Sequence, residues 1–305
     1  MTASEPAGPA VHEQSRARYP DQAGFVERPG ARVFYEVYGS GEPAILFLPT
    51  WTLVHSRIWK MQIPDFARRH KVITFDPRGN GRSDRPTDVA AYAETEFEAD
   101  ALAVLDATGT DRAVIVSLSM GAHRALLLAT EHPERVEGAI FVAPSLPFNA
   151  SYDRKKALKA FLAPAPNDEG WNKYNATYWR RAYPDFLEFF FGQGFSEAHS
   201  TKPREDAVSW GRETDPETLI RSTVRDGLNN REAALERASR VHCPVLVIHG
   251  TDDDIRDHAD GAELARLTGG QFLSIERGGH FPNVRDPVLV NLAIRDFVRR
   301  LGDES

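Results

Sequence analysis

One serine, one aspartate and one histidine are placed where they could act together on a carbonyl group. Ser119 lies between an apolar run and an apolar helical stretch, within Ser117-Leu118-Ser119-Met120-Gly121. A serine hydroxyl is a weak nucleophile at neutral pH, so it needs a base and an acid that orients the base. His280 follows two glycines, and Asp253 lies in an Asp-rich segment after another apolar run. The chain order serine, aspartate, histidine is typical of nucleophilic catalysis at the edge of a parallel sheet.

Buried strands are expected to position these three residues. Short apolar runs recur along the chain, with helical patterns such as residues 96–105 and 120–131 between most of them. The predicted strands cover residues 33–38, 44–48, 71–75, 113–116, 139–142, 245–248 and 273–275. Because parallel strands need long crossovers, this alternation predicts a doubly wound parallel α/β sheet. Each of the three residues follows a strand, at the edge where open parallel sheets place their ligand sites.

The segment 146–240 interrupts this alternation. It lacks buried strand runs and is rich in aromatic residues, so we interpret it as a helical cap inserted into one core domain. That core would consist of residues 24–145 and 241–305. Residues 1–23 are rich in Pro, Ala, Glu and Arg without any periodicity, which predicts a flexible N-terminal leader.

The last helix has the clearest local signals. Asp286 can cap it, and Pro287 suits its first position. The apolar residues expected on its core-facing side are Leu289, Leu292, Ala293, Val298 and Leu301.

Taken together, these motifs resemble the α/β-hydrolase superfamily over about Phe25 to Leu301. The segment around Ser119 is similar to the family's nucleophile elbow, and residues 75–83, Phe-Asp-Pro-Arg-Gly-Asn-Gly-Arg-Ser, are similar to its D-x-R-G-x-G-x-S loop. Within the superfamily, the chain resembles the capped serine hydrolases, which include esterases, lactonases and C–C hydrolases. The resemblance implies a mostly parallel sheet of about eight strands, with the cap in the usual position.

The family pattern also implies which acid completes the triad. That acid is usually the third residue after the glycine of H-G-x-x-D, which is Asp253, while Asp252 and Asp254 remain alternatives. The usual elbow reads G-x-S-x-G, and here Ser117 replaces the first glycine. Serine is nearly small enough for that position.

A hydrolase of this type needs two backbone N–H donors for the developing oxyanion. The resemblance implies Met120 as one donor and Trp51 as the other. Relatives usually carry His-Gly before the second donor, whereas this chain has Pro49-Thr50. Thr50 and His55, in and after this loop, are candidate pocket residues.

We expect the other histidines close to these segments to have structural roles. His249 is expected to shape the turn at Gly250, and His123 to pack in the helix that follows the elbow. His242 precedes a buried strand and is expected to be a packing residue.

The composition excludes several classes of protein. The chain has 305 residues and a net charge of −7, which argues against nucleic-acid binding because phosphates require a basic face. No apolar run approaches the roughly 20 residues that span a bilayer, and no secretory signal is evident. The single cysteine, Cys243, suits a reducing cytoplasm. No metal or cofactor is expected, and the mildly acidic surface is compatible with a monomer or a homodimer.

The expected reaction is hydrolysis of an ester or lactone of a small, partly apolar substrate. Ser119 would attack the carbonyl, His280 would act as general base, and Asp253 would orient the imidazole. C–C bond hydrolysis and cofactor-free perhydrolysis use the same triad and remain alternatives. A weakly catalytic ligand-binding or receptor protein on this fold is a further alternative, because the Pro49-Thr50 loop departs from the family pattern.

Overall fold

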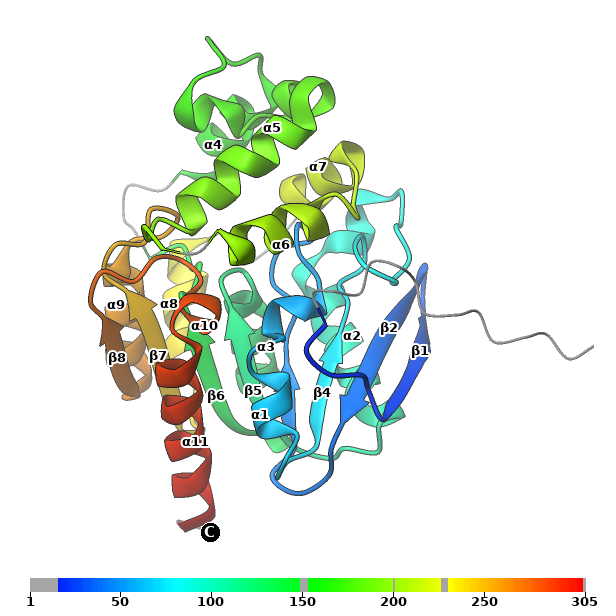
Figure 1. The fold of residues 1–305 in the computed structure, drawn as a ribbon, viewed down its shortest axis with the longest axis vertical. Coiled ribbons are helices and arrows are strands. Elements are labelled where there is room, and N and C mark those ends of the chain that lie inside the picture. The colour runs from blue at the N-terminus through cyan, green and yellow to red at the C-terminus, as the bar shows by residue number, and fades with distance from the viewer. Residues whose placement is uncertain (1–15, 149–152, 200, 226–229, 304–305) are drawn as a thin grey trace, which may run out of the picture.

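The computed structural model describes residues 16–148, 153–199, 201–225 and 230–303 (Figure 1). Its centre is an eight-stranded sheet in the order β1-β2-β4-β3-β5-β6-β7-β8. The strands are β1 Gln22–Arg28, β2 Ala31–Tyr38, β3 Ile45–Phe47, β4 Val72–Phe75, β5 Ala113–Leu118, β6 Val136–Val142, β7 Val245–Gly250 and β8 Gln271–Ile275. The pairs β1–β2 and β2–β4 are antiparallel, and the other pairs are parallel. The predicted doubly wound, mostly parallel sheet is therefore confirmed.

Burial on both faces explains why the central strands read as continuous apolar runs. In β3, Ile45 and Phe47 belong to one core cluster and Leu46 to the other, because successive side chains point to opposite faces. The helices outside the cap are α1 Ile63–Phe66, α2 Glu94–Ala107, α3 Gly121–Glu131, α8 Arg231–Ser239, α9 His258–Thr268, α10 Pro282–Arg285 and α11 Pro287–Asp303. Apolar residues of α1 and α11 join the first cluster, whereas those of α2, α3, α8 and α9 join the second.

The N-terminal part of the described chain is attached to the core. β1 pairs with β2 along its whole length. Arg16 lies 2.9 Å from the Glu36 carboxylate and donates a hydrogen bond of 3.2 Å to the Tyr38 hydroxyl. The predicted leader is therefore wrong for residues 16–23, because an ion pair and a strand hold them. The rest of that prediction, residues 1–15, lies outside the described residues.

Four helices form the cap over the carboxyl edge of the parallel strands (Figure 1). They are α4 Arg154–Leu162, α5 Ala176–Gly194, α6 Lys202–Gly211 and α7 Pro216–Val224. The next helix, α8, packs beside α3 and α9, and its Ala234 and Ala238 join the core cluster. The predicted end of the cap at residue 240 is therefore too late, because α8 packs its alanine face against the core.

The last helix, α11, forms where its capping signals predict it, but its buried face differs. Leu289 and Leu292 are 43% and 49% exposed, so their assignment to the core is wrong. Val298 is buried as predicted, and Ala293 and Leu301 pack partly buried against the core. The other buried apolar residues of the helix are Val290, Ile294 and Phe297. Phe297 can approach the sheet closely because it lies over Gly138, where a Cβ atom would be 2.9 Å from the ring. This contact fixes the rotation of the helix.

Candidate active site

Ser119 lies at a sharp turn between β5 and α3. Its φ of 52° is in the left-handed region, which costs a residue other than glycine roughly 1–3 kcal/mol. The Ser119 N–H donates to the Val142 carbonyl at 2.9 Å, and the Ser119 carbonyl accepts from the Ser145 N–H at 3.0 Å. The surrounding structure thus holds the strained backbone and places the hydroxyl above the N-terminus of α3, where negative charge is favoured.

Serine fits the position where the family usually carries the first elbow glycine. The Ser117 side chain is fully buried, and its hydroxyl donates to the Ile140 carbonyl at 3.1 Å. The closer approach occurs at Gly121, where a Cβ atom would lie 3.0 Å from the Pro49 carbonyl oxygen. The departure at Ser117 therefore buries a hydroxyl group whose hydrogen bond is made.

Three side chains form a continuous line of hydrogen bonds. His280 Nε2 lies 2.9 Å from Ser119 Oγ, and His280 Nδ1 lies 2.7 Å from Asp253 Oδ2. Because the carboxylate can only accept, the Nδ1–H donates to it, and Nε2 is left to accept the serine proton. The His280 backbone N–H donates to the Gly194 carbonyl at the end of α5, at 3.2 Å, so the cap also positions this loop.

Asp253 is the carboxylate that reaches His280, whereas Asp252 and Asp254 are exposed. Its other oxygen, Oδ1, accepts the backbone N–H groups of Ile255 and Arg256 at 2.8 and 2.9 Å. Burial alone would raise the pKa of Asp253. The charge of His280 and hydrogen bonds from His249 and His280 outweigh burial and hold this pKa well below its usual range. The carboxylate therefore stays ionised at neutral pH.

His249 is a site residue that the sequence did not reveal. The sequence predicts only that His249 shapes a turn, but in the structure its Nε2 lies 2.9 Å from Asp253 Oδ2, the same oxygen that His280 contacts. Its ring is fully buried against Gly261, where a Cβ atom would be 2.4 Å from His249 Nδ1. The four-residue spacing between His249 and Asp253 can be read from the sequence, but only the folded turn brings the two side chains together.

The loop after β3 is held from below by a buried arginine. Arg124 on α3 donates to the carbonyls of Pro49 and Thr50 at 2.6 and 2.5 Å. Its guanidinium also pairs with Glu94 at 3.1 Å. Because both loop carbonyls point toward Arg124, the loop is fixed without the glycine that relatives usually carry.

The two expected oxyanion donors lie at the same end of the sheet. Neither the Met120 N–H nor the Trp51 N–H donates a hydrogen bond to a backbone carbonyl of the described residues. The Trp51 ring extends into the aromatic interior of the cap, 5.4 Å from Phe190 and 5.8 Å from Trp179 between ring centres. The second donor position is therefore attached to the cap through its side chain.

A cavity of about 530 Å³ opens between the core and the cap beside Ser119. Its apolar wall is formed mainly by Trp51, Met120, Leu158, Phe161, Trp171 and Phe190. The cavity confirms that some cap aromatics line a pocket, although most of them pack against one another. Its size suits a small organic molecule.

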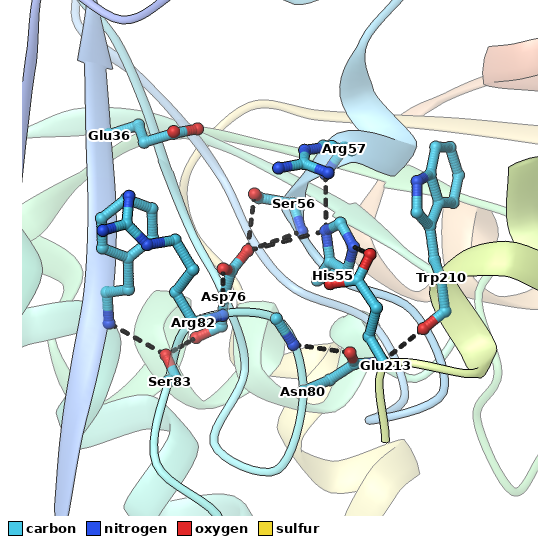
Figure 2. A network of polar contacts seen from close by, with 12 residues as sticks. Glu36, His55, Ser56, Arg57, Asp76, Asn80, Arg82, Ser83, Trp210 and Glu213 are labelled. Carbon is cyan, nitrogen blue, oxygen red and sulfur yellow. Dashed lines mark hydrogen bonds and ion pairs between the residues drawn. The ribbon is translucent and has the colours of Figure 1, made fainter. Parts of the chain in front are cut away.

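Neither candidate pocket residue of the oxyanion loop lines this cavity. Thr50 is buried within the loop and is not among the residues that line the cavity. His55 points to the opposite side, where Figure 2 shows it between Asp76 and the cap residue Glu213. His55 Nε2 lies 3.3 Å from the Glu213 carboxylate, and His55 Nδ1 lies 3.8 Å from Asp76. The ring thus joins core to cap at a distance from the cavity.

The D-x-R-G-x-G-x-S loop supports this junction (Figure 2). Asp76 accepts from the Ser56 hydroxyl at 2.7 Å and from the Arg82 N–H at 2.9 Å. Gly81 has a φ of 57°, and a Cβ atom there would lie 2.3 Å from Asp76 Oδ2. The Asn80 amide donates to the Thr52 carbonyl at 2.8 Å. The motif therefore shapes the scaffold beneath the cap.

Two kinds of feature are absent from the described part of the chain. None of its helices is long and apolar enough to cross a membrane. Within the same residues, no group of three or more His, Cys, Asp or Glu side chains is arranged to hold a metal ion.

Comparison with known proteins agrees with this geometry. Residues 43–287 match the family model described as the alpha/beta hydrolase fold, so the chain belongs to this family and is a hydrolase. It is 28% identical over 236 residues to "Putative carbamate hydrolase RutD" of Escherichia coli, covering 76% of this chain and 83% of that protein. It is 26% identical over 272 residues to 3-oxoadipate enol-lactonase 2 of Acinetobacter baylyi, covering 88% and 93%. The solved structure of an N-acyl homoserine lactone degrading enzyme superposes with a TM-score of 0.72 at 26% identity, covering 90% of this chain and 100% of that one.

Proposed function

We propose that this protein hydrolyses carboxylic esters or lactones of small, partly apolar molecules through Ser119, His280 and Asp253. The observation that carries the proposal is the line of hydrogen bonds from Asp253 through His280 to the Ser119 hydroxyl, which opens into the cavity. Relatives named for lactone and carbamate hydrolysis support it, because both reactions begin with attack on a carbonyl carbon. A cytoplasmic location and a homodimer stay predictions.

The reaction proceeds in two acyl-transfer steps. Ser119 Oγ bonds to the carbonyl carbon as its proton passes to His280 Nε2, and that proton then protonates the leaving alkoxide as the C–O bond breaks. Water next attacks the acyl-enzyme, His280 accepts one of its protons, and the same proton returns to Ser119 Oγ as the acid product leaves. Asp253 keeps its charge throughout and stabilises the imidazolium.

The carbonyl oxygen becomes negatively charged in each step. The backbone N–H groups of Met120 and Trp51 are the proposed donors to this oxygen, and removing one such donor typically costs about 10²–10³ in rate. Arg124 supports the proposal for Trp51, because it fixes the carbonyls of the two preceding residues.

A fluorophosphonate probe tests the proposed nucleophile directly. We expect the purified protein to be labelled at Ser119 alone, as mapped by mass spectrometry, and labelling to be lost in Ser119→Ala and weakened in His280→Ala. Ser209→Ala, which changes an exposed cap serine, is the matched control and should label like the native protein. A panel of para-nitrophenyl esters and lactones then reports turnover. A folded protein that neither labels at Ser119 nor hydrolyses any of these compounds would contradict the proposal and favour a ligand-binding role.

A further inference from the structure

A small side chamber adjoins the main cavity. It has a volume of about 80 Å³ and shares Trp51, Met120 and Ser145 with the larger cavity. Ser119 lines the larger cavity next to these shared residues. A substrate whose carbonyl lies at Ser119 could therefore extend a short group into the chamber.

Three arginines from separate elements converge on this chamber. Arg154 is the first residue of the cap helix α4, and Arg225 follows the end of α7. Arg256 lies in the loop after β7, and its backbone N–H donates to the triad carboxylate of Asp253. The chamber is thus positively charged by residues of both core and cap.

The described structure compensates the charge of these arginines only in part. No Asp or Glu lines the main cavity or the side chamber. Arg225 pairs with Glu94 at 3.1 Å, but Glu94 also pairs with the buried Arg124, so one carboxylate faces two guanidinium groups. Among the described residues, no carboxylate forms an ion pair with Arg154 or Arg256. Arg256 also borders a neighbouring cavity with Asp153, Asp257 and Asp260, and its charge acts on Asp260 without an ion-pair contact among the described residues.

The arginines keep donors available for a ligand. Arg154 is held by two hydrogen bonds from one nitrogen, Nη2, to the carbonyls of Thr223 and Arg225 at 2.9 and 3.0 Å. The Arg256 side chain donates no hydrogen bond to any described residue, and it lines both the main cavity and the chamber. A guanidinium group at the wall of a cavity without a protein acceptor can donate to a ligand, and hydrogen bonds to charged groups are among the stronger ones.

His123 completes one wall of the chamber without adding charge at neutral pH. Burial lowers the pKa of His123 to about 4, and its Nε2–H donates to the Ser145 carbonyl at 2.7 Å. The charge of the chamber therefore comes from the arginines.

We infer that this chamber binds a carboxylate group of the substrate, with Arg154 and Arg256 as its direct partners and Arg225 as a nearby charge. This inference rests on the proposed function and narrows it to esters or lactones that carry a carboxylate near the scissile bond. Guanidinium groups match carboxylates geometrically, and charge-assisted hydrogen bonds are stronger than neutral ones. The apolar cavity wall then contacts the remainder of the molecule.

Two esters of matched length test the inference. Mono-para-nitrophenyl glutarate carries a terminal carboxylate, whereas para-nitrophenyl hexanoate ends in an ethyl group of similar shape. We expect kcat/KM for the charged ester to exceed that for the neutral ester roughly tenfold or more, because the free energies of hydrogen bonds to charged groups correspond to ratios of this size. In Arg154→Gln and Arg256→Gln, the ratio of the two kcat/KM values should fall by a similar factor, chiefly through KM for the charged ester. Lys155→Gln, which removes an exposed charge next to Arg154, should leave the ratio unchanged.

Binding without turnover separates this inference from the proposed function. Calorimetry on Ser119→Ala should show tighter binding of monomethyl glutarate than of dimethyl glutarate, and Arg154→Gln in that background should remove the difference. This result would stand even if fluorophosphonate labelling failed. Equal affinities, preference for the neutral ester, or tighter binding of methyl phosphate than of monomethyl glutarate would each overturn the carboxylate assignment.

Discussion

At the scale of single residues, the strained backbone of Ser119 connects local conformation to chemistry. The left-handed region costs a residue other than glycine roughly 1–3 kcal/mol, because its Cβ crowds the following carbonyl. We expect Ser119→Gly to be more stable than Ser119→Ala by about 1 kcal/mol, the reverse of the usual order of glycine and alanine. Urea unfolding of the two variants measures the difference. Both should be inactive, and an alanine variant as stable as the glycine variant would show that the turn carries no strain.

His249 contributes through Asp253, so it is a positioning residue. Replacing it by leucine removes one of the four hydrogen-bond donors to this carboxylate, and hydrogen bonds to charged groups contribute about 1.5–3 kcal/mol. We expect kcat of His249→Leu on a para-nitrophenyl ester to fall about tenfold or more with KM nearly unchanged. His258→Leu, whose ring centre lies 5.6 Å from that of His249, is the matched control. Equal losses in both variants would indicate a general packing effect.

At the scale of elements, the end of α5 sets the position of the histidine loop. The Gly194 carbonyl accepts the His280 N–H, and a Cβ atom on Gly194 would lie 2.4 Å from the Phe281 ring. We expect Gly194→Ala to displace Phe281 and lower kcat by roughly tenfold or more, because a small misplacement of the base reduces catalysis strongly. Kinetics on a para-nitrophenyl ester measure this loss.

Gly192, one half-turn earlier in α5, provides the control for this substitution. A Cβ atom there would meet only the flexible Arg204 side chain, at 3.5 Å. Gly192→Ala should keep native activity and gain up to about 1 kcal/mol of stability, since alanine is the better helix former. Loss of activity in both variants would mean that α5 tolerates no added methyl group, rather than that the His280 loop is specifically displaced.

The parts of the fold that the sequence predicted are those fixed by local patterns. Buried strands are recognised in the sequence as β-branched apolar runs. The elbow is recognised by the small residues that its sharp turn requires. The boundary near α8 was not predicted, because nothing local distinguishes an alanine face that packs on the core from one that packs in a cap. The same limit applies to Leu292 on α11, which is apolar but exposed. Long-range partners, such as Arg124 and the carbonyl of Thr50, leave no signal in a single sequence.

At the scale of the whole molecule, one buried charge network joins the sheet edge, a crossover helix and the cap. Glu94 at the start of α2 pairs with Arg124 beneath the oxyanion loop and with Arg225 at the end of the cap helices. Burial would raise the pKa of Glu94, but the two arginines lower it to about 2. The ionised form of Glu94 therefore stabilises the fold above its ordinary pKa of 4.5, and this stabilisation is lost only as the pH falls toward about 2.

Two other groups act at milder pH and in opposite directions. Burial lowers the pKa of His123 from 6.5 to about 4, so the unfolded chain binds a proton in this window while the folded chain does not. Acidification therefore destabilises the fold through His123. Burial raises the pKa of Asp260 from 3.8 to about 6, so the folded chain binds its proton first. Acidification through pH 6 therefore stabilises the fold through Asp260.

Removing His123 should reveal this balance. Between pH 7 and pH 5, the His123 contribution to the free energy of unfolding falls by about 2 kcal/mol, as one pKa unit corresponds to about 1.4 kcal/mol. In His123→Gln, whose amide keeps a donor for the Ser145 carbonyl, this decrease in the free energy of unfolding should be absent. The variant should therefore become more stable relative to the native protein as the pH drops. Asp260→Asn should change in the opposite sense. Urea unfolding of the three proteins at pH 7 and pH 5 measures both differences. Parallel pH profiles for His123→Gln and the native protein would show that the ring is protonated as readily in the folded chain as in the unfolded one.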